Sequence, residues 1–437
     1  MTADDPRGVR VVLDARPLQE PHRAPTTAAY LGSLLGAYDA APIAGESFAF
    51  LLQSDLDDPT VAFERLSVVG RRLLPPTRLL RSGALTVDPF LVGGASLGAA
   101  WRAARSGAAG AVYHASGGAL PLFSQVPTVV TLLDLAPWQL PHTYQRGAVA
   151  RFGQRLRGQL LREAAAVIVT ADVLVGPARR LLHLRRDRIH VVRLAPRRAF
   201  VDAGHRAGTG GARHRDGSAA RAATIPERER LGLPERYLIY PGRYDARQDL
   251  PTLLRALVDL AAAGRPATLP DHVVWPPRVL LVGASPDDRA SLARSAAREG
   301  VGDTLAYAPS LDIDRVAALV AGARAAIFPA VSESAALAAI EAIAAGTPVV
   351  ASAVGALPEV VGAAGILVEP REPSRLAAAL TTVWSDDVVH ERLAAEARER
   401  SARDDRSWPD VARETRAVYL AVGAAGPRVS DPGGGRS

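Results

Sequence analysis

Short apolar runs alternate with longer amphipathic segments along this chain, and the alternation occurs in two blocks. In the first block we expect strands at Val9–Asp14, Phe48–Leu52, Ala111–His114, Thr128–Leu132, Val167–Thr170 and Ile189–Leu194, with helices near Thr26–Asp39, Gln145–Glu163 and Asp172–Leu184. In the second block we expect strands at Tyr237–Tyr240, Val279–Val282, Thr304–Tyr307, Ala325–Phe328, Pro348–Ala351 and Ile366–Val368, with helices that include Leu250–Ala263, Asp287–Arg298 and Asp312–Ala321. Such alternation is typical of β-α units around a parallel sheet. The pattern predicts an α/β protein with two doubly wound, Rossmann-like domains.

The two blocks are separated by residues 202–224, which are rich in Gly, Ala and Arg and have no apolar periodicity. We therefore expect an N-terminal domain over residues 1–200, a flexible linker or insertion over 201–225 and a C-terminal domain over 226–408. A helix over 409–422 is expected to cross back to the first domain, and the tail over 423–437 to be disordered. Because doubly wound folds bind ligands outside the carboxyl ends of their strands, we expect an active site in an interdomain cleft.

Composition removes several classes of enzyme. Apolar residues make up 48% of the 437 positions and charged residues 22%, which is typical of a folded globular protein. The chain has no Cys, which excludes thiol nucleophiles, disulfides and Cys-ligated metals. All 52 cationic residues are Arg, so no Lys is present to form a Schiff base or to complete a Walker A loop. The sequence also shows no Gly-x-Ser-x-Gly elbow of a hydrolase.

Positive charge is concentrated in the first half of the chain. Residues 1–200 carry 24 Arg and 15 acidic residues. Arg151, Arg155 and Arg162 lie on an expected helix whose apolar stripe is Val149, Phe152, Leu156 and Leu160. This basic amphipathic helix either contacts anionic lipid headgroups or an acidic acceptor, or is a solvated outer face. Nucleic acid is not an expected partner, because the Arg-rich stretch lacks interleaved aromatic residues.

The sequence predicts a cytoplasmic protein. The first 20 residues include Asp4, Asp5 and Asp14 and contain no apolar core of a signal peptide. The longest uncharged stretch, Ser106 to Leu133, is broken by Gly and Pro, so no membrane-spanning helix is expected. Peripheral attachment to the inner face of the plasma membrane is a further expectation from the basic helix.

The segment from Ile327 to Leu367 contains the most informative pattern. It begins as a strand and continues into an expected helix, with Glu333 at the turn beside the N-cap candidates Ser332 and Ser334. Glu341 follows eight residues later, about 12 Å along a helix. A helix N-terminus suits a diphosphate, and a carboxylate deeper in the helix can accept hydrogen bonds from a ribose diol.

This segment resembles the retaining GT-B glycosyltransferases of family 4, also called glycosyl transferases group 1. The resemblance lies in Glu333 and Glu341, the run Glu341-Ala-Ile-Ala-Ala-Gly-Thr-Pro-Val-Val, and Pro358-Glu-Val-Val-Gly362. Val11-Val-Leu-Asp-Ala-Arg-Pro17 and Tyr240-Pro-Gly-Arg-Tyr-Asp245 resemble the opening strands of the two domains. The resemblance implies metal-independent transfer of a sugar from a nucleotide-diphosphate donor, with the acceptor on the N-terminal domain and no cofactor.

The resemblance also implies roles for individual residues. Glu333 and Asp134 are the implied catalytic residues. The implied donor-binding residues are Arg243, Arg247, Gln248, Ser334, Ala335 and Glu341, with Arg243 at the diphosphate and Glu341 at the ribose. His114, Thr26 and Thr27 are the implied contacts to acceptor or sugar, although His114 could instead fill a satisfied core position. No metal ligands are expected, because Asp55-Leu-Asp57 and Asp312-Ile-Asp314 are short patterns and Asp312 is better explained as a helix cap.

Several motif positions are altered. Ser334-Ala-Ala-Leu-Ala338 stands where the family has Gly-Phe-Gly-Leu-Pro, Gln248 replaces a Lys, Leu133 replaces a His, and Ala24-Pro-Thr-Thr-Ala28 replaces a Gly-rich turn. We therefore keep two hypotheses. The first is a retaining hexosyltransferase, with a mannosyl group as one candidate, acting on a cell-envelope polysaccharide or glycolipid acceptor. The second is a non-catalytic homologue that binds a sugar nucleotide or partners an active glycosyltransferase.

Overall fold

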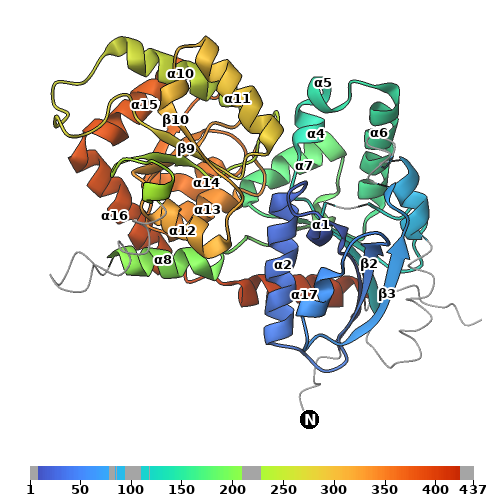
Figure 1. Ribbon diagram of the computed structural model, residues 1–437. Coiled ribbons are helices and arrows are strands. Elements are labelled where there is room, and N and C mark those ends of the chain that lie inside the picture. Colours follow the sequence, from blue (N-terminus) through green and yellow to red (C-terminus); the bar gives the residue numbers. More distant parts are fainter. Residues whose placement is uncertain are drawn as a thin grey trace, which may run out of the picture. The chain divides into compact units, whose positions relative to one another are not determined.

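The computed structural model describes residues 8–77, 84, 86–93, 110–117, 119–208 and 228–423. The chain forms two compact units, Met1–Arg193 with Trp408–Ser437, and Leu194–Ser407. Each unit is an α/β domain built around a parallel sheet (Figure 1). The predicted fold class of two doubly wound, Rossmann-like domains is confirmed, whereas the interdomain cleft stays a prediction.

Unit 1 contains a seven-stranded parallel sheet with the order β3-β2-β1-β4-β5-β6-β7. Its strands are β1 Arg10–Asp14, β2 Ser47–Gln53, β3 Val68–Leu74, β4 Ala111–Ala115, β5 Thr128–Thr131, β6 Ala166–Val169 and β7 Ile189–Val191. β1 and β4 are buried along their whole length, as expected for central strands covered on both faces. The chain reverses its direction of winding between these two strands, so their carboxyl ends form the topological switch point of unit 1.

The helices of unit 1 come from both ends of the chain. They are α1 Arg16–Gln19, α2 Pro25–Ala40, α4 Ala136–Gln139, α5 Pro141–Tyr144, α6 Ala148–Glu163, α7 Val175–Leu182 and α17 Trp408–Gly423. α17 lies against α2 and β4 (Figure 1). The Arg416 guanidinium donates to both oxygens of the buried Glu46 carboxylate, at 2.9 and 2.6 Å. This ion pair and the apolar contacts around it hold the last helix of the described chain on the first unit.

Unit 2 contains a six-stranded parallel sheet with the order β10-β9-β8-β11-β12-β13. Its strands are β8 Leu238–Tyr240, β9 Val279–Val282, β10 Leu305–Ala308, β11 Ala325–Phe328, β12 Val349–Ser352 and β13 Gly365–Val368. Its helices are α8 Arg198–Gly208, α10 Leu250–Ala263, α11 Pro286–Arg298, α12 Ile313–Ala321, α13 Leu337–Ala344, α14 Leu357–Val361, α15 Pro373–Ser385 and α16 Asp387–Arg403. The switch point of this sheet lies between β8 and β11.

The core of unit 2 explains why its helices form where the apolar periodicity predicts. α10 and α15 lie side by side and bury Leu253, Leu257, Leu380 and Trp384 against the sheet. α12 begins after Asp312, whose carboxylate accepts the Arg315 backbone N–H at 2.9 Å. The predicted cap is therefore confirmed, and this carboxylate satisfies a donor that a helix N-terminus otherwise leaves unpaired.

The structure corrects the expected organisation at two places. β3 was not predicted, because it is an edge strand whose central residues are exposed and whose sequence, Val-Val-Gly-Arg-Arg-Leu-Leu, has no clear alternation. Residues 201–208, expected in the linker, belong to α8 of unit 2, since Phe200 and Ala203 bury one apolar face of that helix. The boundary between the units accordingly falls after Arg193. The remainder of the expected linker and the tail from residue 424 lie outside the described residues.

Candidate functional site

The switch point of unit 2 gathers two loops that carry most of the predicted donor-site residues. The loop after β8 contains Arg243, Asp245, Arg247 and Gln248, and the loop after β11 contains Glu333. The Val331 N–H donates to the Arg247 carbonyl at 2.7 Å, which joins the two loops. β8 and β11 are neighbouring parallel strands, so both loops emerge at the same edge of the sheet.

The Glu333 carboxylate is held by contacts from both loops. One oxygen accepts the backbone N–H groups of Ala335 and Ala336 at 3.2 and 2.9 Å, and the other accepts the Gln248 side-chain amide at 3.3 Å. These contacts fix the carboxylate at the sheet edge and leave further acceptor sites on both oxygens, because a carboxylate has about four lone-pair directions. Glu333 is therefore an oriented acceptor with Gln248, in place of a Lys, as its neighbour.

A glycine also fixes the Glu333 loop. The Ala356 N–H donates to the Glu333 carbonyl at 3.0 Å. Gly355 has a φ of +55°, and a Cβ at this position would lie 1.7 Å from the same carbonyl oxygen. Only glycine permits this approach, since it lacks a Cβ and adopts positive φ without strain.

Three charged side chains form a cluster in the loop after β8. Arg247 is buried and donates to both oxygens of Asp245 through its Nε, at 2.9 and 3.1 Å. Arg243 is 27% exposed, and its Nε lies 3.3 Å from the same carboxylate. Burial alone would raise the pKa of Asp245, but hydrogen bonds and charges from the two Arg residues lower it below its usual range. The loop thus carries two cations and one ionised acid.

The helix after Glu333 begins later than the sequence predicted. α13 starts at Leu337, and Ala336 before it has a left-handed backbone with a φ of 49°. Neither Ser332 nor Ser334 provides a side-chain cap for α13. The physical reason is that the Glu333 carboxylate accepts the N–H groups of Ala335 and Ala336 and holds the chain in a loop. Ser334 and Ala335 are buried in this loop and are not part of the helix.

Glu341 lies inside α13 and pairs with a residue that no sequence motif indicated. Arg197, just before α8, donates to both Glu341 oxygens at 2.5 and 2.9 Å. Glu341 is 3% exposed and Arg197 is 32% exposed. Burial raises the pKa of Glu341, and the Arg197 guanidinium counteracts that shift. Within the described part of the chain, the Glu341 carboxylate pairs with Arg197 and not with Arg243 or Gln248, so the structure gathers the predicted donor residues into two groups.

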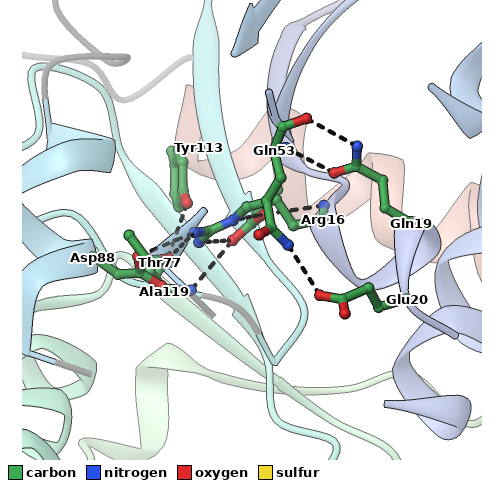
Figure 2. Close-up of polar contacts among 9 residues, drawn as sticks. Arg16, Gln19, Glu20, Gln53, Thr77, Asp88, Tyr113 and Ala119 are labelled. Atoms are coloured by element: carbon green, nitrogen blue, oxygen red, sulfur yellow. Dashed lines mark hydrogen bonds and ion pairs between the residues drawn. The ribbon is translucent and has the colours of Figure 1, made fainter. Parts of the chain in front are cut away.

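A second polar cluster lies at the switch point of unit 1. Asp14 ends β1 and is 1% exposed, and its carboxylate accepts the Arg16 guanidinium at 2.9 and 2.8 Å. Arg16 also lies 3.1 Å from Asp88, and the Ala119 N–H donates to Asp14 at 3.3 Å. Burial would lower the pKa of Arg16, but the charge of Asp14 and further contacts raise it above its ordinary value. Figure 2 shows the contacts of Arg16 with Asp88 and Thr77.

A cavity of about 220 Å³ borders this cluster. Its wall includes Asp14, Arg16, Gln53, Asp88 and Arg157, together with small or apolar residues from several loops. Gln53 at the end of β2 donates to Glu20 at 3.2 Å, and its backbone N–H donates to Gln19 at 2.8 Å (Figure 2). The polar side chains on one part of the cavity wall therefore hold one another in place, and the rest of the wall is mostly apolar.

The predicted acceptor residues of unit 1 have different environments. His114 is fully buried inside the unit, with its Nε2 2.8 Å from the Thr131 hydroxyl and its Nδ1 2.6 Å from the Tyr419 hydroxyl. Of the two interpretations of His114, its environment is that of a satisfied core position, because α17 covers the side chain. Thr26 and Thr27 lie in the first turn of α2, and Thr27 packs against Gly117. The Asp134 carboxylate accepts the Ala136 N–H at 2.8 Å at the start of α4.

The sequence did not single out Arg16, Arg157 or Arg197. The Asp14-Ala-Arg16 run resembles the opening strand of a domain, and this resemblance assigns Arg16 no role. In a chain whose cations are all Arg, residue type gives little signal, and only the three-dimensional contacts distinguish these three from solvated Arg residues.

Comparison with protein families gives a match for the second unit. Residues 223–400 match the model of the family described as "Glycosyl transferases group 1". The second unit carries a glycosyl transferases group 1 region. Glu333, Glu341, Arg243, Arg247 and Gln248 all lie within the matched residues.

Curated relatives match less than half of the chain. The chain is 37% identical over 205 residues to D-inositol 3-phosphate glycosyltransferase from Nocardioides sp., covering 44% of this chain and 43% of that protein. It is 40% identical over 123 residues to MMP alpha-(1->4)-mannosyltransferase from Mycolicibacterium hassiacum, covering 28% of this chain and 30% of that protein. The matches thus span less than half the length of these relatives.

Solved structures resemble the whole chain in fold. Sucrose-phosphate synthase from Thermosynechococcus elongatus has a TM-score of 0.66 and 20% identity, covering 95% of this chain and 100% of that chain. HepE from Anabaena, in complex with UDP and glucose, has a TM-score of 0.63 and 15% identity, covering 94% of this chain and 100% of that chain. At these identities the likeness concerns the fold alone. The described residues contain no cluster of three or more His, Asp or Glu placed to hold a metal.

Proposed function

We propose that this protein is a glycosyltransferase that moves a hexosyl group from a nucleotide-diphosphate sugar to an acceptor, with the donor bound at the switch point of unit 2. The observation that carries the proposal is the Glu333 carboxylate, held by Gln248 and two backbone N–H groups within the region that matches the glycosyl transferases group 1 family. Ligands of doubly wound sheets bind at this edge.

The charge cluster after β8 suits a diphosphate. Arg243 is partly exposed, and its Nε lies 3.3 Å from Asp245, so its guanidinium is accessible to an incoming anion. Arg247 is buried against Asp245 and is better suited to positioning the loop. A diphosphate would replace part of the Asp245 contact to Arg243. We therefore assign Arg243 as the donor ligand and Arg247 as a positioning residue, with Ser334 and Ala335 forming the adjacent loop wall.

Glu341 remains our candidate for the donor ribose. Its two oxygens each accept one Arg197 donor, which leaves lone pairs for two hydroxyl groups. Arg197 would keep this buried carboxylate ionised and oriented, as a positioning residue. A neutral ribose diol suits such a site, because the charge of Glu341 is already balanced.

The proposed reaction retains the anomeric configuration and needs no metal or cofactor. The bond between the sugar C1 and the diphosphate oxygen breaks, a bond forms from C1 to the acceptor hydroxyl oxygen on the same face, and the hydroxyl proton passes to the departing diphosphate. Arg243 would stabilise the charge that develops on the leaving group. Glu333 would contact the reacting sugar, and Asp134 is the second candidate catalytic residue.

The described activities of similar proteins and the surface of α6 support one class of acceptor. A structural neighbour, WaaG, is described as a glycosyltransferase of lipopolysaccharide biosynthesis, and a relative as a mannosyltransferase, which supports a cell-envelope polysaccharide or glycolipid acceptor and a mannosyl donor as candidates. Helix α6 exposes Val149 and Phe152 at 53% and 57%, beside the exposed Arg151, Arg155 and Arg162. We call these three Arg residues the α6 basic face. Exposed apolar and basic side chains together favour attachment to an anionic membrane surface from the cytoplasmic side.

No helix in the described part of the chain is long and apolar enough to cross a bilayer.

One observation favours the alternative of a non-catalytic homologue that binds a sugar nucleotide or partners an active enzyme. Leu133 is buried at 6% exposure, where the resemblance implies a sugar-contacting His. The side chain at this position then offers no polar group to the sugar. Catalysis and binding must therefore be measured separately.

A turnover assay tests the proposal. Release of nucleotide from UDP-, GDP- and ADP-hexoses is followed with and without EDTA, for the wild type, Glu333→Gln and the exposed control Glu299→Gln. We expect turnover in EDTA, and a kcat lowered by about 100-fold in Glu333→Gln with little change in KM. Full activity in Glu333→Gln would refute its role, and rescue of an EDTA-blocked enzyme by Mg²⁺ would refute metal independence. Nucleotide binding with no turnover would favour the non-catalytic alternative.

A further inference from the structure

The cavity of unit 1 contains a cation, Arg157, with no direct counter-ion among the described residues. Arg157, on α6, lines the cavity, and its Nε is buried without a hydrogen-bond partner among the described residues. Its guanidinium lies over the Trp138 ring at 5.5 Å, and this side chain makes no hydrogen bond or ion pair within the described part of the chain. Buried cations are normally paired, because removing a charge from water is costly.

The electrostatic surroundings of Arg157 also indicate a positive charge that is not fully balanced. Burial lowers the pKa of Arg157 below its ordinary value, and the charge of Asp134 only partly opposes that shift. The Asp134 carboxylate itself accepts the Ala136 N–H. Arg157 remains protonated at any physiological pH, because its ordinary pKa is far above 7. The cavity wall therefore carries a permanent positive charge with no direct counter-ion among the described residues.

The other cations of the cavity differ from Arg157. Arg16 is paired with both Asp14 and Asp88, at 2.8 and 3.1 Å. Arg23 is 53% exposed and pairs with Glu20 at 3.3 Å. Their charges are already balanced within the cavity wall. An anion that enters the cavity would therefore be held by Arg157 rather than by Arg16 or Arg23.

One part of the wall suits hydroxyl groups. Glu20 presents carboxylate oxygens and Gln53 presents an amide, and both are held by neighbouring side chains, whereas the Asp14 oxygens already accept three N–H groups of Arg16 and the Ala119 N–H. Ala24, also in the wall, is the N-cap of α2 and has no side chain to cap it, so the positive end of that helix adds to the field of Arg157. The volume of about 220 Å³ accommodates a small ligand, not a macromolecule.

We propose that this cavity binds a polyhydroxylated group that carries one anionic substituent, with Arg157 holding the anion and the Glu20 and Gln53 side chains holding hydroxyl groups. The inference rests on the proposed function in one respect, since it identifies this group as the sugar acceptor or as the terminal group of a larger acceptor. The anion is a phosphate or another tetrahedral or planar anion, and it could belong either to a free sugar or to a lipid headgroup.

Calorimetric titration with inorganic phosphate tests the anion subsite directly. We compare the wild type with Arg157→Gln, the charge-retaining Arg157→Lys, and Arg179→Gln, an exposed Arg on α7 outside the cavity wall. We expect phosphate binding to weaken at least 10-fold in Arg157→Gln, to be partly kept in Arg157→Lys and to be unchanged in Arg179→Gln. Equal binding in wild type and Arg157→Gln, or no binding in the wild type, overturns the proposal.

Two further arms identify the source of the anion. Glucose 6-phosphate is compared with glucose, and vesicles of phosphatidylglycerol are compared with vesicles of phosphatidylcholine. Arg157-dependent binding of the sugar phosphate assigns the site to a free phosphorylated polyol, and Arg157-dependent binding of the anionic vesicles assigns it to a headgroup. If neither is dependent on Arg157, the polyol part of the proposal is wrong even where phosphate binds.

Stability and nucleotide binding distinguish an anion subsite from a structural role of Arg157. Removing a charge that has no direct partner among the described residues should leave the unfolding midpoint of Arg157→Gln unchanged or raised, whereas a fall of several degrees would indicate a structural role and overturn the proposal. Arg157→Gln should bind nucleoside diphosphates like the wild type. Phosphate binding that is lost in Arg243→Ala and kept in Arg157→Gln would assign the anion to unit 2 and refute the subsite. Failure of nucleotide binding alone would refute the proposed function and leave the phosphate result standing.

Discussion

Burial of His114 predicts a pH dependence of the stability of unit 1. The side chain is fully buried, and burial lowers its pKa from 6.5 to about 3. Its two ring nitrogens lie beside the hydroxyl groups of Thr131 and Tyr419, and the Tyr30 hydroxyl lies 2.9 Å from that of Thr131. In the folded unit His114 therefore stays neutral at a pH at which the unfolded chain takes up a proton.

The sign follows from the depressed pKa. The stabilisation from a neutral His114 is fully present above pH 6.5 and is lost as the pH falls from 6.5 toward 3. Each pH unit in that window costs about 1.4 kcal/mol, so lowering the pH from 7.5 to 5 should cost unit 1 about 2 kcal/mol through this residue. The equilibrium constant for opening would rise about 30-fold.

Hydrogen exchange followed by mass spectrometry measures this effect in unit 1 alone. Peptides from β4 and β5 report its opening, after correction for the intrinsic pH dependence of exchange. His114→Gln removes the titrating group and should lose the 30-fold component, whereas the exposed control His142→Gln should keep it. Carboxylates that titrate in the same range contribute equally to all three proteins. The same pH dependence in wild type and His114→Gln would refute the reasoning.

Two other predictions concern the second unit and the membrane. Arg197→Met removes the partner of the buried Glu341 carboxylate and should destabilise unit 2 by about 2–3 kcal/mol, which is less than for a fully buried pair because Arg197 is partly exposed. Arg198→Met changes an exposed side chain and is the control. Equal denaturant midpoints for wild type and Arg197→Met would contradict the pairing. Replacing the α6 basic face by Ser should lower binding to anionic liposomes about 100-fold, from about 1 kcal/mol per Arg. Co-sedimentation that is unaffected by salt or by lipid charge would exclude that surface.

The β-α alternation was sufficient to predict the sheets, because central parallel strands are short, apolar and bounded by turn residues. β9 and β11 and the helix α10 begin and end where the pattern predicts. β3 was not predicted, because the central residues of this edge strand are exposed and its Arg residues interrupt the apolar pattern. Local patterns therefore suffice where burial is complete and fail at the edge of a sheet.

The candidate site could be predicted only in part. Motif spacing brought Glu333 and the loop after β8 together, because both follow neighbouring parallel strands. The Arg197–Glu341 pair joins residues 144 positions apart, and the His114–Tyr419 contact joins residues 305 positions apart. No local pattern encodes such contacts. The late start of α13 depends on the Glu333 carboxylate, a side-chain contact that helix periodicity does not reveal.

The proposed function depends most on a nucleoside diphosphate binding at the β8–β11 edge of unit 2 beside Arg243. Calorimetric titration of UDP, GDP and ADP into the wild type, Arg243→Ala and Arg255→Ala measures this binding, with Arg255 as an exposed Arg on α10. We predict that at least one of the three nucleotides binds to the wild type, that its affinity falls at least 10-fold in Arg243→Ala, and that Arg255→Ala behaves as the wild type. Binding of none of the three nucleotides, or equal affinity in wild type and Arg243→Ala, would contradict the proposed donor site.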